Sequence, residues 1–174
     1  RKITQMAKLP EFEGRILLLE GYDLNLSRSL VAGVDVWLNN PIYPLEASGT
    51  SGMKAAMNGA LNLSVLDGWW GEGYDEGDDG VANGWAIKPV PGHLSDAQRD
   101  AEEARTLYEL LQDQVIPTYY RTGPMGYSPE WVAMSKRSIS TISPRFNVTR
   151  MVSEYVKKFY APAAVHGRRF AQAD

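Results

Sequence analysis

The chain has 174 residues and a formal net charge of −3, with 44% hydrophobic and 22% charged residues, a composition typical of a globular protein without a basic surface for nucleic acid. It has no cysteine and only two histidines, so disulfides and thiolate metal sites are excluded and we expect no metal site. No apolar run approaches the roughly 20 residues that cross a bilayer and the first residues do not resemble a signal peptide, so we expect a cytoplasmic protein without membrane contact.

Three apolar runs in the first part of the chain predict strands that are separated by helices. They are GRILLLEGY (14–22), VDVWLNN (34–40) and ALNLSVLDG (60–68). Asp23 can cap a helix that Gly33 ends, and a short helix is expected from about Gly52 to Asn58, closed by Gly59. Apolar strands that alternate with helices predict an α/β fold with a parallel sheet, which binds ligands at the carboxyl ends of its strands.

The chain after Gly68 predicts a long loop followed by helices. WWGEGYDEGDDGVANG (69–84) has neither helical nor strand periodicity and indicates a functional or mobile loop. The capping box of Ser95 and Gln98 begins a helix that is expected to end at Pro117, and Ser128-Pro129 begins another that Pro144 ends. Asn147 can cap a last helix with an apolar stripe that includes Met151, Val152, Tyr155 and Phe159.

The loop at 69–84 leaves two interpretations open. Trp69, Trp70 and Tyr74 could stack on sugar rings, or they could pack in the core. The acidic residues near this loop lack the spacing of a calcium-binding EF-hand, because the twelfth position counted from Asp75 is Ala86. We therefore expect no calcium site here.

The loop before the short helix, SGTSG (48–52), could be a plain turn or a phosphate-binding turn in which small residues let backbone N–H groups converge. The predicted helix places Lys54 in its first turn, where the helix dipole would favour an acid. Lys54 could be a solvated surface cation, a charge that clamps a phosphate, or an amine that forms an imine, as with pyridoxal phosphate. Glu46 could accept hydrogen bonds from a hydroxylated ligand or lie in water at the rim.

The segment EASGTSGMKAAMNGALNLSVLDG (46–68) resembles the pyridoxal-phosphate segment of the glycogen and α-glucan phosphorylases, whose common form is Glu-Ala-Ser-Gly-Thr-Gly-Asn-Met-Lys. Residues 18–41 resemble the family's preceding strand and helix, and FNVTRMVSEYVKKFY (146–160) resembles its C-terminal helix. The resemblance covers nearly the whole chain. Ser51 and Gly52 depart from the common Gly-Asn, and a glycine conformation at Ser51 would strain the loop.

The resemblance implies a GT-B enzyme that splits α-1,4-glucan with inorganic phosphate to release glucose 1-phosphate. Residues 1–145 would be part of its C-terminal Rossmann-like domain, which binds the cofactor and the glucosyl unit. Residues 146–174 would be the C-terminal crossover helix and tail, which pack on the other domain. The apolar stripe of this helix would then lack its natural cover, and we expect a homo-oligomer or other association through it.

The resemblance also implies roles for single residues. Lys54 would be the catalytic lysine, which holds pyridoxal 5'-phosphate as a Schiff base, and the cofactor's phosphate would handle protons for the incoming phosphate. Backbone N–H groups of Thr50 and Ser51 would hold the cofactor phosphate. The glucosyl unit would be bound by Glu46, Ser48 and Gly49.

Two alternatives stay open. A nucleotide-sugar glucosyltransferase of the glycogen or starch synthase type also has a GT-B fold, with a glutamate and a glycine-rich loop before a short helix, but it has no imine lysine. A non-catalytic glucan-binding module would account for the tryptophan-rich loop. Because three strands are about half of a doubly wound sheet, we expect these 174 residues alone to be catalytically silent.

Overall fold

A computed structural model describes residues 2–45, 49–90 and 92–171, and the chain divides into two units, residues 1–30 and 31–174. The first unit contains α1 (Lys2–Met6) and the start of α2 (Leu24–Gly33). The predicted cap of α2 is confirmed, since the backbone N–H of Leu26 donates to Asp23 Oδ1 at 2.8 Å.

The strand predicted at 14–22 is wrong. These residues form turns and irregular backbone, and Leu17, Leu18 and Leu19 expose 73%, 53% and 54% of their surface. A strand is stable only when its backbone groups pair with a neighbouring strand. No ladder to this run is present in the described part of the chain, so its apolar composition alone does not produce a strand.

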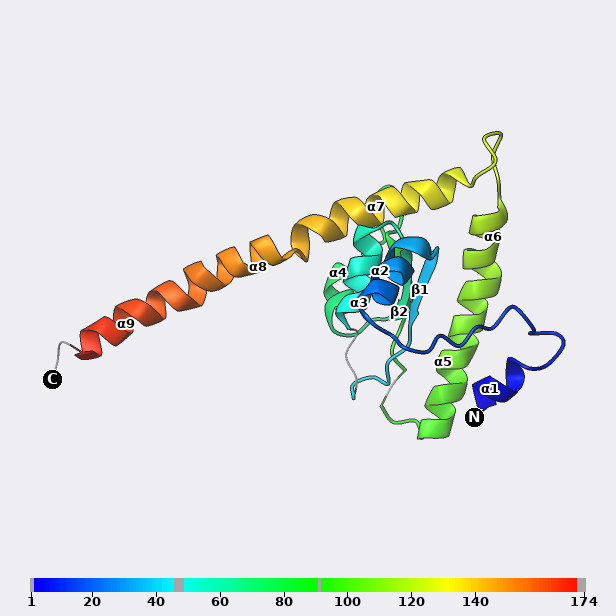
Figure 1. The fold of residues 1–174 in the computed structure, drawn as a ribbon, viewed down its shortest axis with the longest axis horizontal. Coiled ribbons are helices and arrows are strands. Elements are labelled where there is room, and N and C mark those ends of the chain that lie inside the picture. Colours follow the sequence, from blue (N-terminus) through cyan, green and yellow to red (C-terminus); the bar gives the residue numbers. More distant parts are fainter. Residues whose placement is uncertain (1, 46–48, 91, 172–174) are drawn as a thin grey trace. The chain divides into compact units, whose positions relative to one another are not determined.

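The second unit is built on a parallel sheet of three strands in the order β1-β2-β3 (Figure 1). The strands are β1 (Val36–Asn39), β2 (Leu61–Val65) and β3 (Gly84–Ile87). In the central strand, Leu63 is in register with Leu38 on one side and Trp85 on the other. The predicted α/β fold with a parallel sheet is confirmed, although β3 falls at the end of the predicted loop and in the residues after it.

The two faces of β2 are covered differently. Alternate residues of a strand point to opposite faces, and Leu61, Leu63 and Val65 belong to one apolar cluster with Val115 and Met134. The other face carries Asn62 and Ser64, which are also buried. Asn62 contacts α3 (Thr50–Met57), the crossover helix between β1 and β2. The buried side chain of Asn62 thus lies under the helix that carries Lys54.

The two tryptophans after β2 belong to the core. They begin α4 (Trp69–Gly73), and both are buried. Trp70 Nε1 donates to the carbonyl oxygen of Trp85 at 3.2 Å, and the Trp69 ring lies 5.4 Å from that of Phe146. The core interpretation is therefore correct for both residues.

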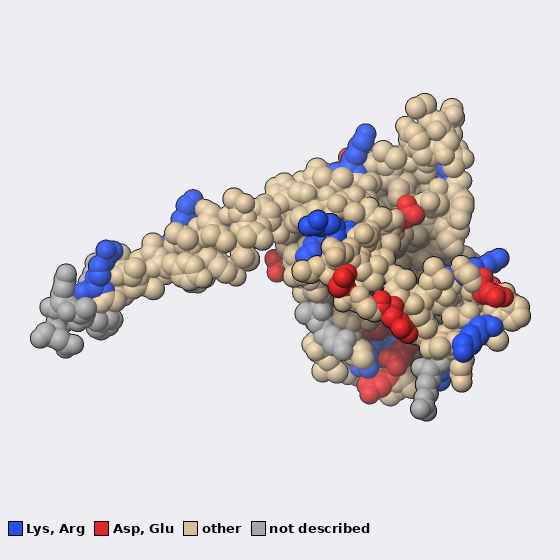
Figure 2. Space-filling model, viewed as in Figure 1, with Lys and Arg blue, Asp and Glu red and all other residues tan. Residues whose placement is uncertain are grey.

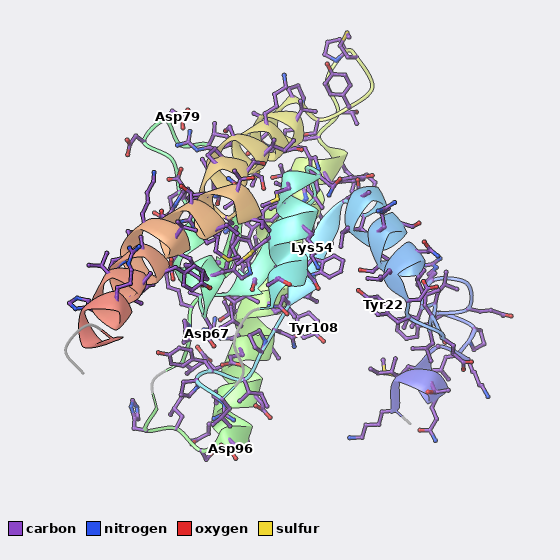
Figure 3. All side chains as sticks on the ribbon, turned by 60° about the vertical axis from the view of Figure 1, so that its left-hand side comes forward. Tyr22, Lys54, Asp67, Asp79, Asp96 and Tyr108 are labelled. Atoms are coloured by element: carbon purple, nitrogen blue, oxygen red, sulfur yellow. The ribbon has the colours of Figure 1, made fainter. Side chains whose placement is uncertain are left out.

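The acidic loop after α4 is tied to α7 (Pro129–Arg145) by Arg137. Arg137 Nη2 and Nη1 donate to Asp75 Oδ2 at 3.2 Å and to Asp79 Oδ1 at 2.9 Å. Figure 3 shows Asp79 on this loop beside α7. Asn83 donates to the carbonyl oxygen of Gly73 at 2.8 Å and to Thr141 Oγ1 at 3.0 Å. The loop is therefore anchored by specific side-chain contacts.

Replacing Arg137 by alanine is expected to lower the free energy of unfolding of the 174-residue chain by about 1 kcal/mol near neutral pH, the range of partly exposed ion pairs. The pKa of Asp75 is lowered, chiefly because its carboxylate accepts from the backbone N–H of Gly77; burial opposes this shift, and Arg137 lowers the pKa further. A carboxylate whose pKa is lower in the folded state stabilises the fold at pH values above its unfolded-state pKa. This stabilisation is lost as the pH falls through the folded-state pKa.

The difference between wild type and Arg137→Ala should therefore fade only as the pH falls below the ordinary Asp pKa of about 4 and through the lowered folded-state pKa of Asp75. Urea unfolding at neutral and acidic pH measures it. Arg121→Ala, which removes the exposed pair with Glu130 at 3.2 Å, is the control and should cost less. An Arg137→Ala deficit that persists unchanged in acid would contradict the role given to Asp75.

The remaining helices largely follow their caps. The capping box of Ser95 and Gln98 is present at the start of α5 (Asp96–Leu110), and Ser128 Oγ accepts from the backbone N–H of Trp131 at the start of α7. Pro117 does not end the helical run, because a π-helical turn, η1 (Leu111–Val115), leads into α6 (Ile116–Tyr120). Pro117 is near the start of α6, where a missing N–H is tolerated.

The chain ends in the helical segments α8 (Val148–Tyr155), η2 (Val156–Tyr160) and α9 (Ala161–Ala171). The Asn147 cap is confirmed, since the backbone N–H of Arg150 donates to Asn147 Oδ1 at 2.8 Å. The apolar stripe is exposed at Met151, Val152, Tyr155 and Phe159. Figure 2 shows this segment as mostly uncharged surface with a few basic side chains. Among the described residues, no helix combines the length and the hydropathy that spanning a bilayer requires.

Candidate functional site

Lys54 lies in the last turn of α3, because this helix begins at Thr50 and not at Gly52 as predicted. Gly49 is the N-cap, with extended backbone angles that let the helix begin directly after it. The prediction that Lys54 faces the positive end of the helix dipole is therefore wrong, and the dipole favours a cation at its position. Ser51 lies inside α3, and no described residue other than glycine has a positive φ. Ser51 therefore does not adopt a glycine conformation, and the backbone strain considered for this position does not arise.

The first turn of α3 provides backbone N–H groups without a partner inside the helix, at the carboxyl edge of the sheet. β1 ends at Asn39, α3 begins at Thr50 and β2 is parallel to β1, so the N-terminus of α3 follows the carboxyl end of β1. The first N–H groups of a helix have no partner within the helix and attract anions. Thr50 and Ser51 supply two such groups, four and three residues before Lys54.

Thr50 and Lys54 lie on the same side of α3, since residues four apart are neighbours on a helix surface. Long helical side chains lean toward the N-terminus of the helix. An exposed Lys54 side chain can therefore extend toward the turn that carries the free N–H groups. Figure 3 labels Lys54 on α3.

A hollow of about 560 Å³ lies beside Lys54, within the range of roughly 300–1,000 Å³ that is typical of sites for small ligands and cofactors. Its lining is mainly apolar, from Met53 and Met57 of α3 and from Phe146 and Met151 around the start of α8. Arg150 also lines it and donates to Glu154 Oε1 at 2.8 Å. The hollow thus combines an apolar lining, an amine and a guanidinium.

These residues fit pyridoxal phosphate, an aromatic ring with an aldehyde and a phosphate. The apolar side chains suit the ring, Lys54 supplies the amine, and the N-terminal turn of α3 and Arg150 suit a phosphate. The chemistry of this lining therefore favours an organic anion.

A second hollow of 310 Å³ lies at the carboxyl edge of the sheet. Val65 and Ile87, at the ends of β2 and β3, form one side, and Asp100 and Glu103 of α5 contribute carboxylates. Parallel sheets bind ligands at this edge. Carboxylates here can accept hydrogen bonds from a hydroxylated molecule.

The structure brings together only part of the predicted site. Thr50, Ser51 and Lys54 share one helix, and Gly49 is its exposed N-cap. Glu46 and Ser48 lie outside the described residues. Sequence reasoning did not place in the site the residues that line the hollow opposite α3. These residues lie about 90 positions later in the chain and are Phe146, Asn147, Val148, Arg150 and Met151. The Asn147 cap, the apolar stripe that includes Met151 and the resemblance of residues 146–160 to a C-terminal helix are their signals in the sequence, and none of these connects them to Lys54.

The fold and the site define an α/β protein with a lysine-bearing helix that begins at the carboxyl edge of a parallel sheet. No family model matches the chain. Maltodextrin phosphorylase of Thermococcus litoralis is 50% identical over 163 residues, which are 94% of this chain and 18% of that protein. Glycogen phosphorylase of Mycobacterium bovis is 46% identical over 173 residues, 99% of this chain and 20% of that protein.

Glycogen phosphorylase of Aquifex aeolicus is 47% identical over 161 residues, 92% of this chain and 22% of that protein. The chain is therefore homologous, over nearly its whole length, to a segment of the glycogen and maltodextrin phosphorylases. It spans about a fifth of the length of these relatives.

Proposed function

We propose that these 174 residues belong to an α-glucan phosphorylase of the GT-B type, which splits α-1,4-glucan with inorganic phosphate to give glucose 1-phosphate. The observation that carries the proposal is the position of Lys54, on the helix whose free N-terminal N–H groups and apolar flank suit pyridoxal 5'-phosphate. The homology to glycogen and maltodextrin phosphorylases supports it. We use "full-length protein" for a chain of the relatives' length that contains these residues.

The residues of α3 would divide the binding of the cofactor among them. Lys54 Nζ would hold it covalently, and the N–H groups of Thr50 and Ser51 would bind its phosphate at the positive end of the helix dipole. Met53 and Phe146 would exclude water from the ring. When bound, the cofactor would supply a phosphate group that exchanges protons with the substrate phosphate.

The glucosyl unit would be held on the segment that leads into α3. Glu46 would accept hydrogen bonds from sugar hydroxyls, and Ser48 and Gly49 would provide further polar contacts. This assignment rests on the resemblance of residues 46–54 to the phosphorylase segment. We also propose that residues 1–145 are part of the C-terminal Rossmann-like domain, that residues 146–174 cross to the other domain, and that the full-length protein is a homo-oligomer.

The substrate is tested by phosphorolysis of maltoheptaose with added pyridoxal phosphate. The full-length protein is expected to release glucose 1-phosphate at ordinary enzyme rates of about 1–10³ per second, and the 174-residue chain is expected to release none. The reason is that three strands with one lysine helix provide only one wall of a site that must hold two substrates. Turnover by the 174-residue chain, or a full-length protein that needs a nucleotide sugar, would contradict the proposal.

A further inference from the structure

Asn62 is a buried polar residue on the central strand of the sheet. It lies on β2 with 0% of its surface exposed, between Leu61 and Leu63. Its Nδ2 donates to the carbonyl oxygen of Gly52 at 3.1 Å, which connects the central strand to the first turns of α3. Its Oδ1 is buried and has no hydrogen-bond partner in the described part of the chain.

Position 52 requires glycine because this contact leaves no room for a side chain. A Cβ atom at position 52 would lie 2.6 Å from Asn62 Oδ1 and 2.8 Å from Trp69 Cζ2. The backbone of Gly52 is helical, without a positive φ, so its conformation alone would admit alanine. Asn62 and Trp69 therefore approach the helix closely because position 52 has no side chain.

This contact lies two residues before Lys54, on a helix of eight residues. The backbone of so short a helix moves nearly as one body, so a shift at Gly52 moves both Lys54 and the N–H groups of Thr50 and Ser51. Trp69 also packs against Phe146, which lines the hollow beside Lys54. The contacts of Gly52 with Asn62 and Trp69 therefore reach both sides of this hollow.

The amide of Asn62 is poorly suited to stabilise the core. A buried acceptor without a partner costs free energy, and an apolar residue would fit the strand as Leu61 and Leu63 do. A feature that breaks a local rule of core packing often serves a site. The half-satisfied amide under the lysine helix thus points to a role in holding that helix.

We propose that Asn62 is a positioning residue for Lys54. Its bond to the Gly52 carbonyl sets the position of α3 on the sheet, so that Lys54 Nζ and the N–H groups of the first turn keep the separation that one bound cofactor requires. This inference rests on the proposed function, since it assumes that the cofactor binds at Lys54.

The test compares two buried asparagines in the full-length protein loaded with pyridoxal phosphate. Asn62→Ala should release the cofactor roughly tenfold faster or more and shift its absorbance maximum, because small displacements of a binding group have large effects. Asn83→Ala is the matched control. Asn83 is also 0% exposed and donates to a glycine carbonyl, at Gly73, but it contacts α4 and α7. It should lower the thermal midpoint and leave cofactor release within about twofold.

A second pair of variants tests the contact itself. Gly52→Ala should speed cofactor release strongly in the wild-type background and less in the Asn62→Ala background, where the closest obstacle to a Cβ is gone. Asn62→Ser, which is too short to reach the Gly52 carbonyl, should behave as Asn62→Ala and gives a milder change to the core.

Equal release rates for the Asn62→Ala and Asn83→Ala proteins would overturn the positioning role, as would strictly additive effects of the substitutions at 52 and 62. Reduction of the wild-type protein with borohydride separates this failure from that of the proposed function. If Lys54 is labelled and the Asn62 variants release the cofactor as the control does, only the positioning role is wrong. If Lys54 is not labelled, the proposed function is wrong and the positioning role falls with it.

Discussion

Replacing Lys54 by alanine in the full-length protein is expected to abolish covalent binding of pyridoxal phosphate and to reduce phosphorolysis to the background rate. Lys54 is exposed beside a hollow whose lining is mainly apolar, and alanine has no nucleophilic atom with which to hold the cofactor. The fold should be retained, because the removed side chain is on the surface of α3 and alanine is a strong helix former. The absorbance of the bound cofactor and the rate of glucose 1-phosphate release measure the two effects.

Lys136→Ala is the control for this prediction. Lys136 is an exposed lysine on α7, and its removal should change neither the cofactor content nor the rate. A Lys54→Ala protein that keeps both the bound cofactor and ordinary turnover would show that another amine holds it.

Trp70→Ala is expected to lower the free energy of unfolding of the 174-residue chain by about 3–5 kcal/mol, the range for large aromatic side chains removed from a core. Trp70 is 0% exposed, packs edge-on against Trp69 with ring centroids 5.1 Å apart, and lies 5.5 Å from the ring of Tyr74. Its loss also leaves the Trp85 carbonyl oxygen without the Nε1 donor.

Urea unfolding measures this loss against a control. Tyr120→Ala removes another aromatic side chain, but Tyr120 is 73% exposed and its removal should cost within about 0.5 kcal/mol. Equal stability of the Trp70→Ala and wild-type chains would mean that Trp70 is not part of the core, and it would reopen the sugar-stacking interpretation of this segment.

The elements that the sequence predicted well are those with local signals. Asp23, Ser95, Ser128 and Asn147 each accept a hydrogen bond from a backbone N–H near the start of a helix, as their residue types predict. The segment 60–68, which was predicted as a strand, contains β2, and β2 is buried on both faces. In these cases the residues that decide the structure are within a few positions of one another.

The wrong or missing predictions concern strands, whose formation depends on pairing with strands that are distant in the sequence. The leucines of the run 14–22 match a buried strand, but a strand also needs a neighbour, and composition does not show whether one pairs with it. β3 has only four residues and follows a glycine-rich loop, so its periodicity is too short to detect. It becomes a strand through its pairing with β2.

In the candidate site, too, the local sequence features were predicted, whereas the contacts between distant residues were not. The motif around Lys54 was found from the sequence, but the start of α3 was placed two residues late, and this error reversed the expected effect of the helix dipole on Lys54. Phe146 and Arg150 reach the hollow only through the packing of α7 against α3. Asn62 was assigned to a strand, yet its contact with Gly52 depends on which face of β2 lies under α3.

The most direct test of this account is the identity of the lysine that carries the cofactor. Borohydride reduction of the full-length protein with pyridoxal phosphate fixes the cofactor to its lysine, and peptide mapping then locates it. We expect the added mass on the peptide that contains Lys54. A label on another lysine, or an active protein in which no lysine is labelled, would contradict it.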